Sequence, residues 1–303
     1  TDDGRIKAAL PTIEALRKEG AKVILMAHLG RPKGKVVPEL SLAPVAARLS
    51  ELLGVPVVLA SDTYGEDAQA KVAAMKDGDV VLLENVRFNP EETSKDEAER
   101  AAYAKKLAAL GDVFVSDGFG VVHRAQGSDY DVAADLPAAA GLLVEKEVNA
   151  LSKATEDPER PFTVVLGGSK VSTKIDVIMN LLGKVDNLIL TGGMTYTFAA
   201  AQGGKVGNSI CEPDMFPVAL EILELAKQKG VQLVMSPDAL IADKFAEDAD
   251  TRQAPVNDIP DGWMGLDIGE EGKKTFREHI LGCKTILWNG PVGVFEMDKF
   301  ATG

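Results

Sequence analysis

The strongest constraint on the fold is a regular alternation of short apolar runs and helical periodicities along the whole chain. Eight runs rich in Val, Ile and Leu have the length and composition of buried strands. They cover residues 22–27, 55–60, 79–84, 112–116, 162–166, 187–191, 231–236 and 284–289. The segments between them show the 3.6-residue apolar spacing of amphipathic helices. This alternation predicts an α/β fold in which helices cover both faces of parallel sheets.

Local signals predict where the helices begin and end. The first helix is expected to end at Gly20, and Pro11 is expected to kink or restart it. The sequence Ser94-Lys-Asp-Glu97 reads as a capping box that opens another helix. A helix over about residues 141–156 is followed by a proline-containing break before the next strand. We therefore expect two domains, 1–145 and 146–303, joined by this hinge helix.

Composition narrows the classes of function. The net charge of −13 disfavours nucleic acid and anionic membrane surfaces as partners, so any anion site has to be a local cluster of cations. The two cysteines, Cys211 and Cys283, form neither a disulfide framework nor a metal-binding spacing. This usage is typical of a protein in a reducing cytoplasm.

A glycine turn in the middle of the chain is the clearest candidate for a ligand site. It reads Leu166-Gly-Gly-Ser-Lys-Val-Ser-Thr-Lys174, and Gly167, Gly168 and Ser169 leave the backbone open to a ligand at a helix start. Lys170 and Lys174 are expected one turn apart on that helix, where two cations are unfavourable unless an anion binds them. We favour a polyphosphate, although two solvated lysines after a plain strand-to-helix connection remain the alternative. The turn does not have the Walker A pattern.

The first half of the chain places basic residues after three predicted strands. They stand in His28-Leu-Gly-Arg31-Pro, Asn85-Val-Arg87-Phe and Asp117-Gly-Phe-Gly-Val-Val-His123-Arg124. Ligands of open parallel sheets bind beyond the carboxyl ends of the strands, and arginine suits bidentate capture of phosphate and carboxylate. A shared anion pocket is therefore the favoured interpretation, and surface or loop-bracing side chains are the alternative.

The second half repeats the pattern with an apolar lining. Thr191-Gly-Gly-Met194 and Trp288-Asn-Gly-Pro-Val-Gly-Val-Phe-Glu296 each follow a predicted strand. With Leu266 and Val294 they could form a flat slot, and Glu296 could accept hydrogen bonds from ribose hydroxyls; tight turns and a solvated Glu296 are the alternative. The segment Gly262-Trp-Met-Gly265-Leu-Asp is read as an unusual loop. A nucleotide site in one half and an acid-phosphate site in the other indicate phosphoryl transfer.

These motifs closely resemble those of phosphoglycerate kinases of bacterial type. The matching segments are collinear and span nearly the whole chain: those beginning at Arg5, His28, Glu84, Asp117, Leu166, Gly262 and Trp288. The resemblance implies two Rossmann-like three-layer αβα domains and a cytoplasmic, monomeric enzyme of glycolysis and gluconeogenesis. Its reaction is reversible phosphoryl transfer between ATP and the carboxylate of 3-phosphoglycerate, which yields 1,3-bisphosphoglycerate and ADP. Mg²⁺ would be bound through the nucleotide phosphates, with no protein metal ligand expected in this sequence.

The resemblance also assigns residues to each site. The implied phosphoglycerate site comprises Arg5, His28, Leu29, Gly30, Arg31, Arg87, His123 and Arg124. The implied nucleotide site comprises Gly167, Gly168, Lys170, Lys174, Gly192, Gly193, Gly265, Leu266, Asn289, Pro291, Val294 and Glu296. Arg5, Lys170 and Lys174 are the implied catalytic residues.

The sequence departs from the family pattern at its ends. The family's Arg-x-Asp-x-Asn segment is expected before Thr1, and its Gly-Gly-Gly-Asp-Thr/Ser loop is expected after Gly303, so we expect truncation at both ends. A folded but catalytically inactive fragment that binds nucleotide weakly is therefore an alternative. A nicotinamide dehydrogenase is a weaker one, because the chain lacks the Gly-x-Gly-x-x-Gly turn.

Overall fold

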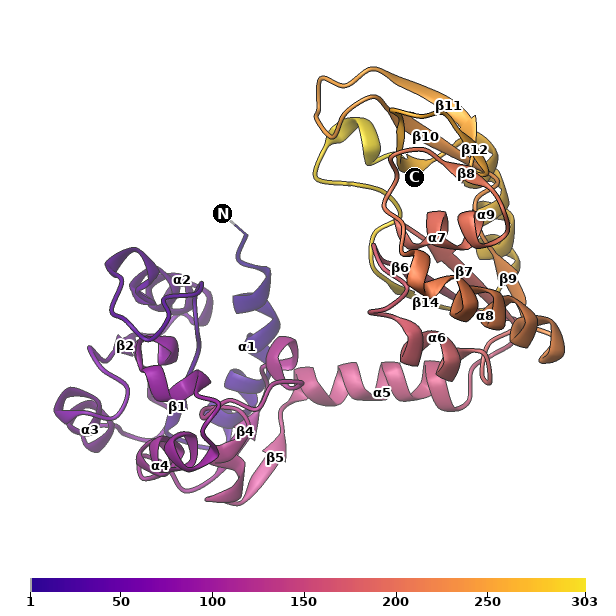
Figure 1. The fold of residues 1–303 in the computed structure, drawn as a ribbon. Coiled ribbons are helices and arrows are strands. Elements are labelled where there is room, and N and C mark those ends of the chain that lie inside the picture. The colour runs from indigo at the N-terminus through magenta and orange to yellow at the C-terminus, as the bar shows by residue number, and fades with distance from the viewer. Residues whose placement is uncertain (1) are drawn as a thin grey trace. The chain divides into compact units, whose positions relative to one another are not determined.

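The computed structural model describes residues 2–303, which form two compact units. Unit 1 is Thr1–Ala150 and unit 2 is Leu151–Gly303. The division falls inside the helix α5 (Leu142–Glu156), five residues later than the boundary expected from the sequence. Each unit has its own sheets and its own core (Figure 1).

Helices and strands alternate from α1 to β4 and again from α5 to β9, as the sequence predicts. Unit 1 contains α1 Gly4–Lys18, β1 Val23–Leu25, α2 Ala43–Leu53, β2 Val57–Leu59, α3 Glu66–Ala73, β3 Val80–Leu82, α4 Glu97–Ala108, β4 Phe114–Ser116, β5 Ala138–Ala140 and the start of α5. Unit 2 contains the end of α5, β6 Phe162–Gly167, α6 Ile175–Leu181, β7 Asn187–Thr191, α7 Met194–Ala201, β8 Lys205–Val206, α8 Phe216–Gln228, β9 Gln232–Val234, β10 Asp238–Ala242, β11 Thr251–Pro255, β12 Asp258–Ile259, β13 Met264–Ile268, α9 Glu270–Gly282 and β14 Thr285–Asn289. All eight predicted strands are present, although most are shorter than expected.

Unit 1 is a three-layer arrangement around the parallel sheet β1-β3-β2. The central strand β3 alternates its side chains between the two faces, as a strand period of two requires. Val80 and Leu82 pack with residues of α1 and α2, whereas Val81 and Leu83 pack with residues of α3 and α4. A second parallel pair, β4-β5, joins the core through Phe114, which packs against α4.

Unit 2 is built in the same way on the parallel sheet β14-β6-β7-β9. Phe162, Val164 and Leu166 of β6 form the largest core cluster with α6, α7 and α8 (Figure 1). Val165 points to the opposite face and packs with Phe276 of α9. The α/β architecture with helices on both sheet faces is thereby confirmed in each unit.

Unit 2 also contains an antiparallel sheet, β11-β10-β13, which the sequence did not predict. This sheet adds to the predicted parallel sheets, and the reading of residues 262–267 as a loop was wrong. Met264, Gly265, Leu266 and Asp267 belong to β13, which pairs with β10. The pairing depends on hydrogen bonds to a strand more than twenty residues away, and the run contains a glycine and an aspartate that weaken its local strand signal.

Two predicted helix features differ in the structure. Helix α1 runs through Pro11 without a break, and the side chain of Pro11 is exposed. The cap of α4 is Asp96 rather than Ser94, because the Asp96 carboxylate accepts hydrogen bonds from the backbone N–H groups of Ala98 and Glu99. None of the helices described over residues 2–303 combines the length and the apolar character that a membrane crossing requires.

Candidate active site

In unit 1 the basic segments follow the carboxyl ends of β1, β3 and β4, where an open parallel sheet binds its ligands. Asn85, which is fully buried, ties two of these segments together. Its side-chain N–H₂ group donates to the carbonyl oxygens of Leu29 (2.9 Å) and Leu40 (3.0 Å), and its side-chain oxygen accepts from the N–H of Arg87 (3.1 Å). Arg87 in turn donates through Nη1 to the carbonyl of Gly30 (3.0 Å). These bonds give the His28–Arg31 loop and Arg87 a common frame.

The charged groups of this frame lie close enough to repel one another. Burial and, to a smaller extent, the positive charges of Arg87, Arg5 and Arg124 together lower the pKa of His28 to about 4. Burial also lowers the pKa of Arg87, and repulsion from Arg124 and Arg31 adds to this effect. The structure therefore brings together Arg5, His28, Arg31, Arg87 and Arg124. A cluster of like charges is unfavourable by itself and becomes favourable when an anion binds among them.

The other residues assigned to the acid-phosphate site have different roles. Leu29 and Gly30 contribute their carbonyl groups to the loop framework, as described above. His123 is exposed, and the structure describes no hydrogen bond from its ring to the other members within residues 2–303.

Glu84 is a supporting residue that the sequence analysis did not assign to the site. Its carboxylate accepts hydrogen bonds from Ser41 Oγ (2.7 Å) and from the backbone N–H groups of Leu42 (2.8 Å) and Asn85 (2.8 Å). It therefore links the start of α2 to the segment that carries Arg87. Its place in the matching Glu84-Asn-Val-Arg87 motif was the only signal in the sequence, because its partner Ser41 lies 43 residues away.

In unit 2 the three glycine turns meet at the carboxyl ends of β6, β7 and β14. The N–H of Gly168 donates to the carbonyl of Thr191 (3.2 Å), and the N–H of Met194 donates to the carbonyl of Gly168 (3.0 Å). A Cβ on Gly192 would lie 2.6 Å from the oxygen of Gly168, and one on Gly167 would lie 2.1 Å from the oxygen of Pro291. Only glycine allows backbones to approach so closely, and Gly192 also has a left-handed φ of 79°. Gly167, Gly168, Gly192, Gly193 and Pro291 are thus brought together.

Lys174 and Asn289 lie at the same junction. The Lys174 Nζ donates to Asn289 Oδ1 at 3.0 Å, so a lysine from the β6–α6 connection meets the segment that follows β14. An ammonium beside a glycine-lined turn is suited to a polyphosphate.

The prediction that Lys170 and Lys174 both occupy the first turns of one helix was wrong. Helix α6 begins at Ile175, so Lys174 is its preceding cap residue and Lys170 lies in the turn before it. Thr173 Oγ1 donates to the carbonyl of Lys170 (2.9 Å), and Ser172 donates to the carboxylate of Glu212. Such side-chain bonds compete with helical ones and delay the start of the helix. The nearest charged neighbour described for Lys170 is Glu212, whose pKa it helps to lower.

The predicted apolar slot is only partly assembled by direct contacts. The N–H of Val294 donates to the carbonyl of Leu266 (2.9 Å), and both side chains belong to one apolar cluster with Phe300. Gly265 lies under the ring of Tyr196, where a Cβ would be 2.0 Å from the hydroxyl. Glu296 is exposed, and no hydrogen bond of its carboxylate is described within residues 2–303.

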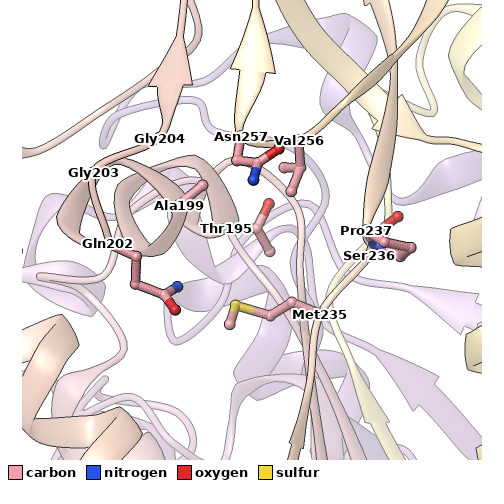
Figure 2. A pocket seen from close by; sticks show the side chains of 10 residues that line it. All are labelled: Thr195, Ala199, Gln202, Gly203, Gly204, Met235, Ser236, Pro237, Val256 and Asn257. Atoms are coloured by element: carbon pink, nitrogen blue, oxygen red, sulfur yellow. The ribbon is translucent and has the colours of Figure 1, made fainter.

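Cavities large enough for a small ligand lie elsewhere. One of about 390 Å³ in unit 2 is lined by residues from α7, from the end of β9 and from the turn before β12 (Figure 2). None of the predicted nucleotide residues lines it. Another, of about 470 Å³, lies beside β2 and β3 in unit 1 and excludes every predicted phosphoglycerate residue. These two cavities do not coincide with the predicted sites.

No group of three or more His, Cys, Asp or Glu side chains within residues 2–303 is arranged to hold a metal ion.

Comparison with known proteins agrees with the motifs. The family model for phosphoglycerate kinase matches residues 1–303. Phosphoglycerate kinases of Bifidobacterium longum and Bifidobacterium adolescentis are 69% and 68% identical over 307 and 306 aligned residues, which cover all of this chain and 76% of each relative. The structure of phosphoglycerate kinase from Coxiella burnetii superposes with a TM-score of 0.81 at 41% identity, over all of this chain and 75% of that one. The enzyme from Pyrococcus horikoshii OT3 gives a TM-score of 0.82 at 30% identity, over 99% of this chain and 76% of that one. The match of family model, sequence and fold over the whole length shows that this chain belongs to the phosphoglycerate kinase family.

Proposed function

We propose that the strand-end cluster of unit 1 binds 3-phosphoglycerate and that the glycine turns of unit 2 bind ATP or ADP. Membership of the family makes the chain a phosphotransferase whose substrates are phosphoglycerate and ATP or ADP. The assignment of the acid to unit 1 is supported by the convergence of Arg5, Arg31, Arg87 and Arg124 around His28. This convergence is the single observation that carries the proposal, because a cationic cluster in a chain of net charge −13 requires an anionic ligand to be favourable.

In the reaction a carboxylate oxygen of 3-phosphoglycerate attacks the γ-phosphorus of ATP, and the bond from that phosphorus to the β,γ-bridging oxygen breaks, so that ADP leaves. The pKa of such a carboxyl group is roughly 3.5, so it is ionised at neutral pH and needs no general base. The barrier is electrostatic, since two anions have to approach each other in line. We assign to Lys174 on the nucleotide side and Arg5 on the acid side the stabilisation of charge on the transferred phosphoryl group. His28 is neutral at pH 7 because of its lowered pKa, so its ring can donate a hydrogen bond to the acid without adding charge.

Other members of the nucleotide site are assigned by their surroundings. Gly167, Gly168, Gly192 and Gly193 would present backbone to the phosphates, and Asn289 would hold Lys174 in place. Gly265, Leu266, Val294 and Glu296 would face the nucleoside, and Lys170 would be a peripheral cation. Mg²⁺ would enter with the nucleotide phosphates and neutralise part of their charge.

The cellular setting forms part of the same proposal. A monomer in the cytoplasm, without nucleic-acid or membrane partners, is supported by the acidic net charge and by the two cysteines, which are both free.

A coupled assay of ADP formation tests the proposal. We expect the 303-residue chain to produce ADP from ATP only when 3-phosphoglycerate is present. Replacing Lys174 by Ala should lower kcat roughly a hundredfold, because its charge is needed mainly in the transition state, while the Kd for ADP changes less than about threefold. Lys229→Ala, which removes an exposed lysine after α8, is the matched control and should leave kcat unchanged.

Two outcomes would contradict this assignment. Equal kcat values for the unmodified chain and Lys174→Ala would remove Lys174 from the mechanism. Tight ADP binding without any phosphoglycerate-dependent turnover would favour the inactive-fragment alternative, which nothing in the comparisons supports at present.

A further inference from the structure

The 3-10 turn Pro90–Thr93 holds the loop that follows Arg124. The main-chain carbonyl of Glu92 accepts a hydrogen bond from the N–H of Gly127 (3.0 Å). The Glu92 carboxylate accepts two more from Ser128, one from the N–H (2.9 Å) and one from Oγ (2.6 Å). Three bonds therefore connect one residue to a loop 36 positions later in the chain. Glu92 is only 1% exposed, so water does not compete for these bonds.

The same turn also contacts the segments that carry the other two arginines. Pro90 packs so tightly against Gly34 that a Cβ on Gly34 would lie 2.7 Å from the Pro90 Cα. Gly34 comes three residues after Arg31, and its N–H donates to the carbonyl of Arg87 (3.2 Å). Thus one short turn is in contact with the segments of Arg31, Arg87 and Arg124.

The charges around Glu92 show that this carboxylate is unfavourable to keep ionised. Burial raises the pKa of Glu92 to about 7, although the Ser128 donors and the Arg87 charge act in the opposite direction. Asp129 lies beside it, and burial raises the pKa of Asp129 to about 6. Within residues 2–303, Nε of Arg87 is buried without a hydrogen-bond partner. Replacing a buried charged group by a well-packed apolar residue of similar volume often leaves a protein as stable or makes it more stable. Stability alone therefore does not explain why a buried carboxylate holds this loop.

We propose that Glu92 is a positioning residue of the phosphoglycerate site, because its clamp on Gly127 and Ser128 sets the place of Arg124 relative to Arg87. The inference rests on the proposed function, since it presupposes that both arginines bind the acid phosphate. Glu92 acts through the loop and does not touch the substrate. Two guanidinium groups bind one anion well only when their spacing is fixed in advance, and the clamp supplies that preorganisation.

Two substitutions at position 92 separate the clamp from the charge. Glu92→Ala removes both side-chain bonds to Ser128 and leaves the backbone bond from Gly127. Glu92→Gln keeps the shape, because its amide oxygen can accept from the Ser128 N–H while its N–H₂ group donates to Ser128 Oγ. Calorimetric titration of the 303-residue chain with 3-phosphoglycerate should show a Kd about tenfold higher for Glu92→Ala. The Kd of Glu92→Gln should stay within about threefold of the unmodified chain.

A double mutant tests whether Glu92 acts through Arg124. Arg124→Ala alone should raise the Kd for 3-phosphoglycerate, and adding Glu92→Ala to it should raise the Kd by less than about twofold further. The Kd for ADP with Mg²⁺, whose proposed site lies in unit 2, should be unchanged in every variant. Glu91→Ala is the matched control, because Glu91 occupies the same turn and no hydrogen bond of its carboxylate is described within residues 2–303.

The outcomes distinguish this inference from the proposed function. If Arg87→Ala and Arg124→Ala leave the Kd for 3-phosphoglycerate unchanged, or the unmodified chain does not bind it, the proposed site and the inference both fail. If the arginine variants weaken binding but Glu92→Ala does not, or its effect is fully additive with Arg124→Ala, the inference alone fails. Should Glu92→Ala not fold, Ser128→Ala removes only one of the clamp bonds and should raise the Kd about threefold; an unchanged Kd would then overturn the inference.

Discussion

At the scale of single residues, His28 shows the effect of charge repulsion within the cationic cluster when no anion is bound. Its ring is half-buried and faces the positive charges of Arg87, Arg5 and Arg124, so the folded protein resists protonating it. The pKa of about 4 lies below the value of 6.5 for an unshifted histidine. The unfolded chain therefore binds a proton at position 28 more readily than the folded protein does at intermediate pH.

This difference predicts a pH dependence of stability. Because the unfolded state binds more protons between pH 6.5 and about 4, the free energy of unfolding should fall as pH is lowered through that window, by at most about 1.4 kcal/mol per pH unit. His28→Gln should flatten this part of the profile, as measured by urea unfolding at a series of pH values. His279→Gln, on α9 of unit 2, is the control. Parallel profiles for His28→Gln and the unmodified chain would show that the histidine is not held neutral.

At the scale of elements, the turns at the two ends of α7 in unit 2 depend on glycine for two different reasons. Gly192 has a left-handed φ of 79° and also lies against the backbone of Gly168. Gly203, after the end of the same helix α7, has a left-handed φ of 89°, but a Cβ added there would meet no atom within 4 Å. Comparing Gly192 with Gly203 separates the effect of a left-handed backbone conformation from the effect of close contact between two turns of the chain.

Alanine substitutions should resolve the two contributions. Gly203→Ala should lower the free energy of unfolding by about 1 kcal/mol, which is the ordinary cost of a left-handed alanine. Gly192→Ala should lower it by about 3 kcal/mol, because the methyl group also displaces the Gly168 backbone, and it should weaken ADP binding. Chemical denaturation and ADP titration of both variants provide the measurement. Equal destabilisation by the two substitutions would mean that the contact between the Gly192 and Gly168 turns adds nothing to the loss of stability.

At the scale of the whole molecule, each of the two units has its own sheets, cores and proposed ligand. The clusters around β3 belong to unit 1 and those around β6 and β7 belong to unit 2. A ligand that binds a folded unit stabilises it by mass action.

We therefore expect two steps in calorimetric unfolding, each sensitive to a different ligand. ADP at about one hundred times its Kd should stabilise one step by about 2.7 kcal/mol and raise its midpoint by several degrees. 3-Phosphoglycerate should raise the midpoint of the other step. Variants that destabilise a single unit, such as Gly192→Ala, identify which step belongs to which unit. A single step that both ligands shift equally would contradict thermal independence of the units.

The sequence by itself determined the α/β class, eight of the strands in the parallel sheets and the family of the chain. These features are local. The spacing of apolar residues, the glycine turns and the contiguous motifs can be recognised without knowing which other segments they contact. For the same reason, Arg31, Arg87 and Arg124 could be named as candidates from the segments that follow the strands, whereas Arg5 was named only from the family resemblance.

Only the tertiary structure decided the features that depend on distant partners. The β11-β10-β13 sheet, the late start of α6 after Lys170 and the clamp from Glu92 to Ser128 all arise from hydrogen bonds between separate segments. In the sequence, the buried Glu92 cannot be distinguished from the exposed glutamates around it. Its proposed role follows from the loop that packs over it. Burial and long-range bonding set the energies of these groups, and neither is a property of the local sequence.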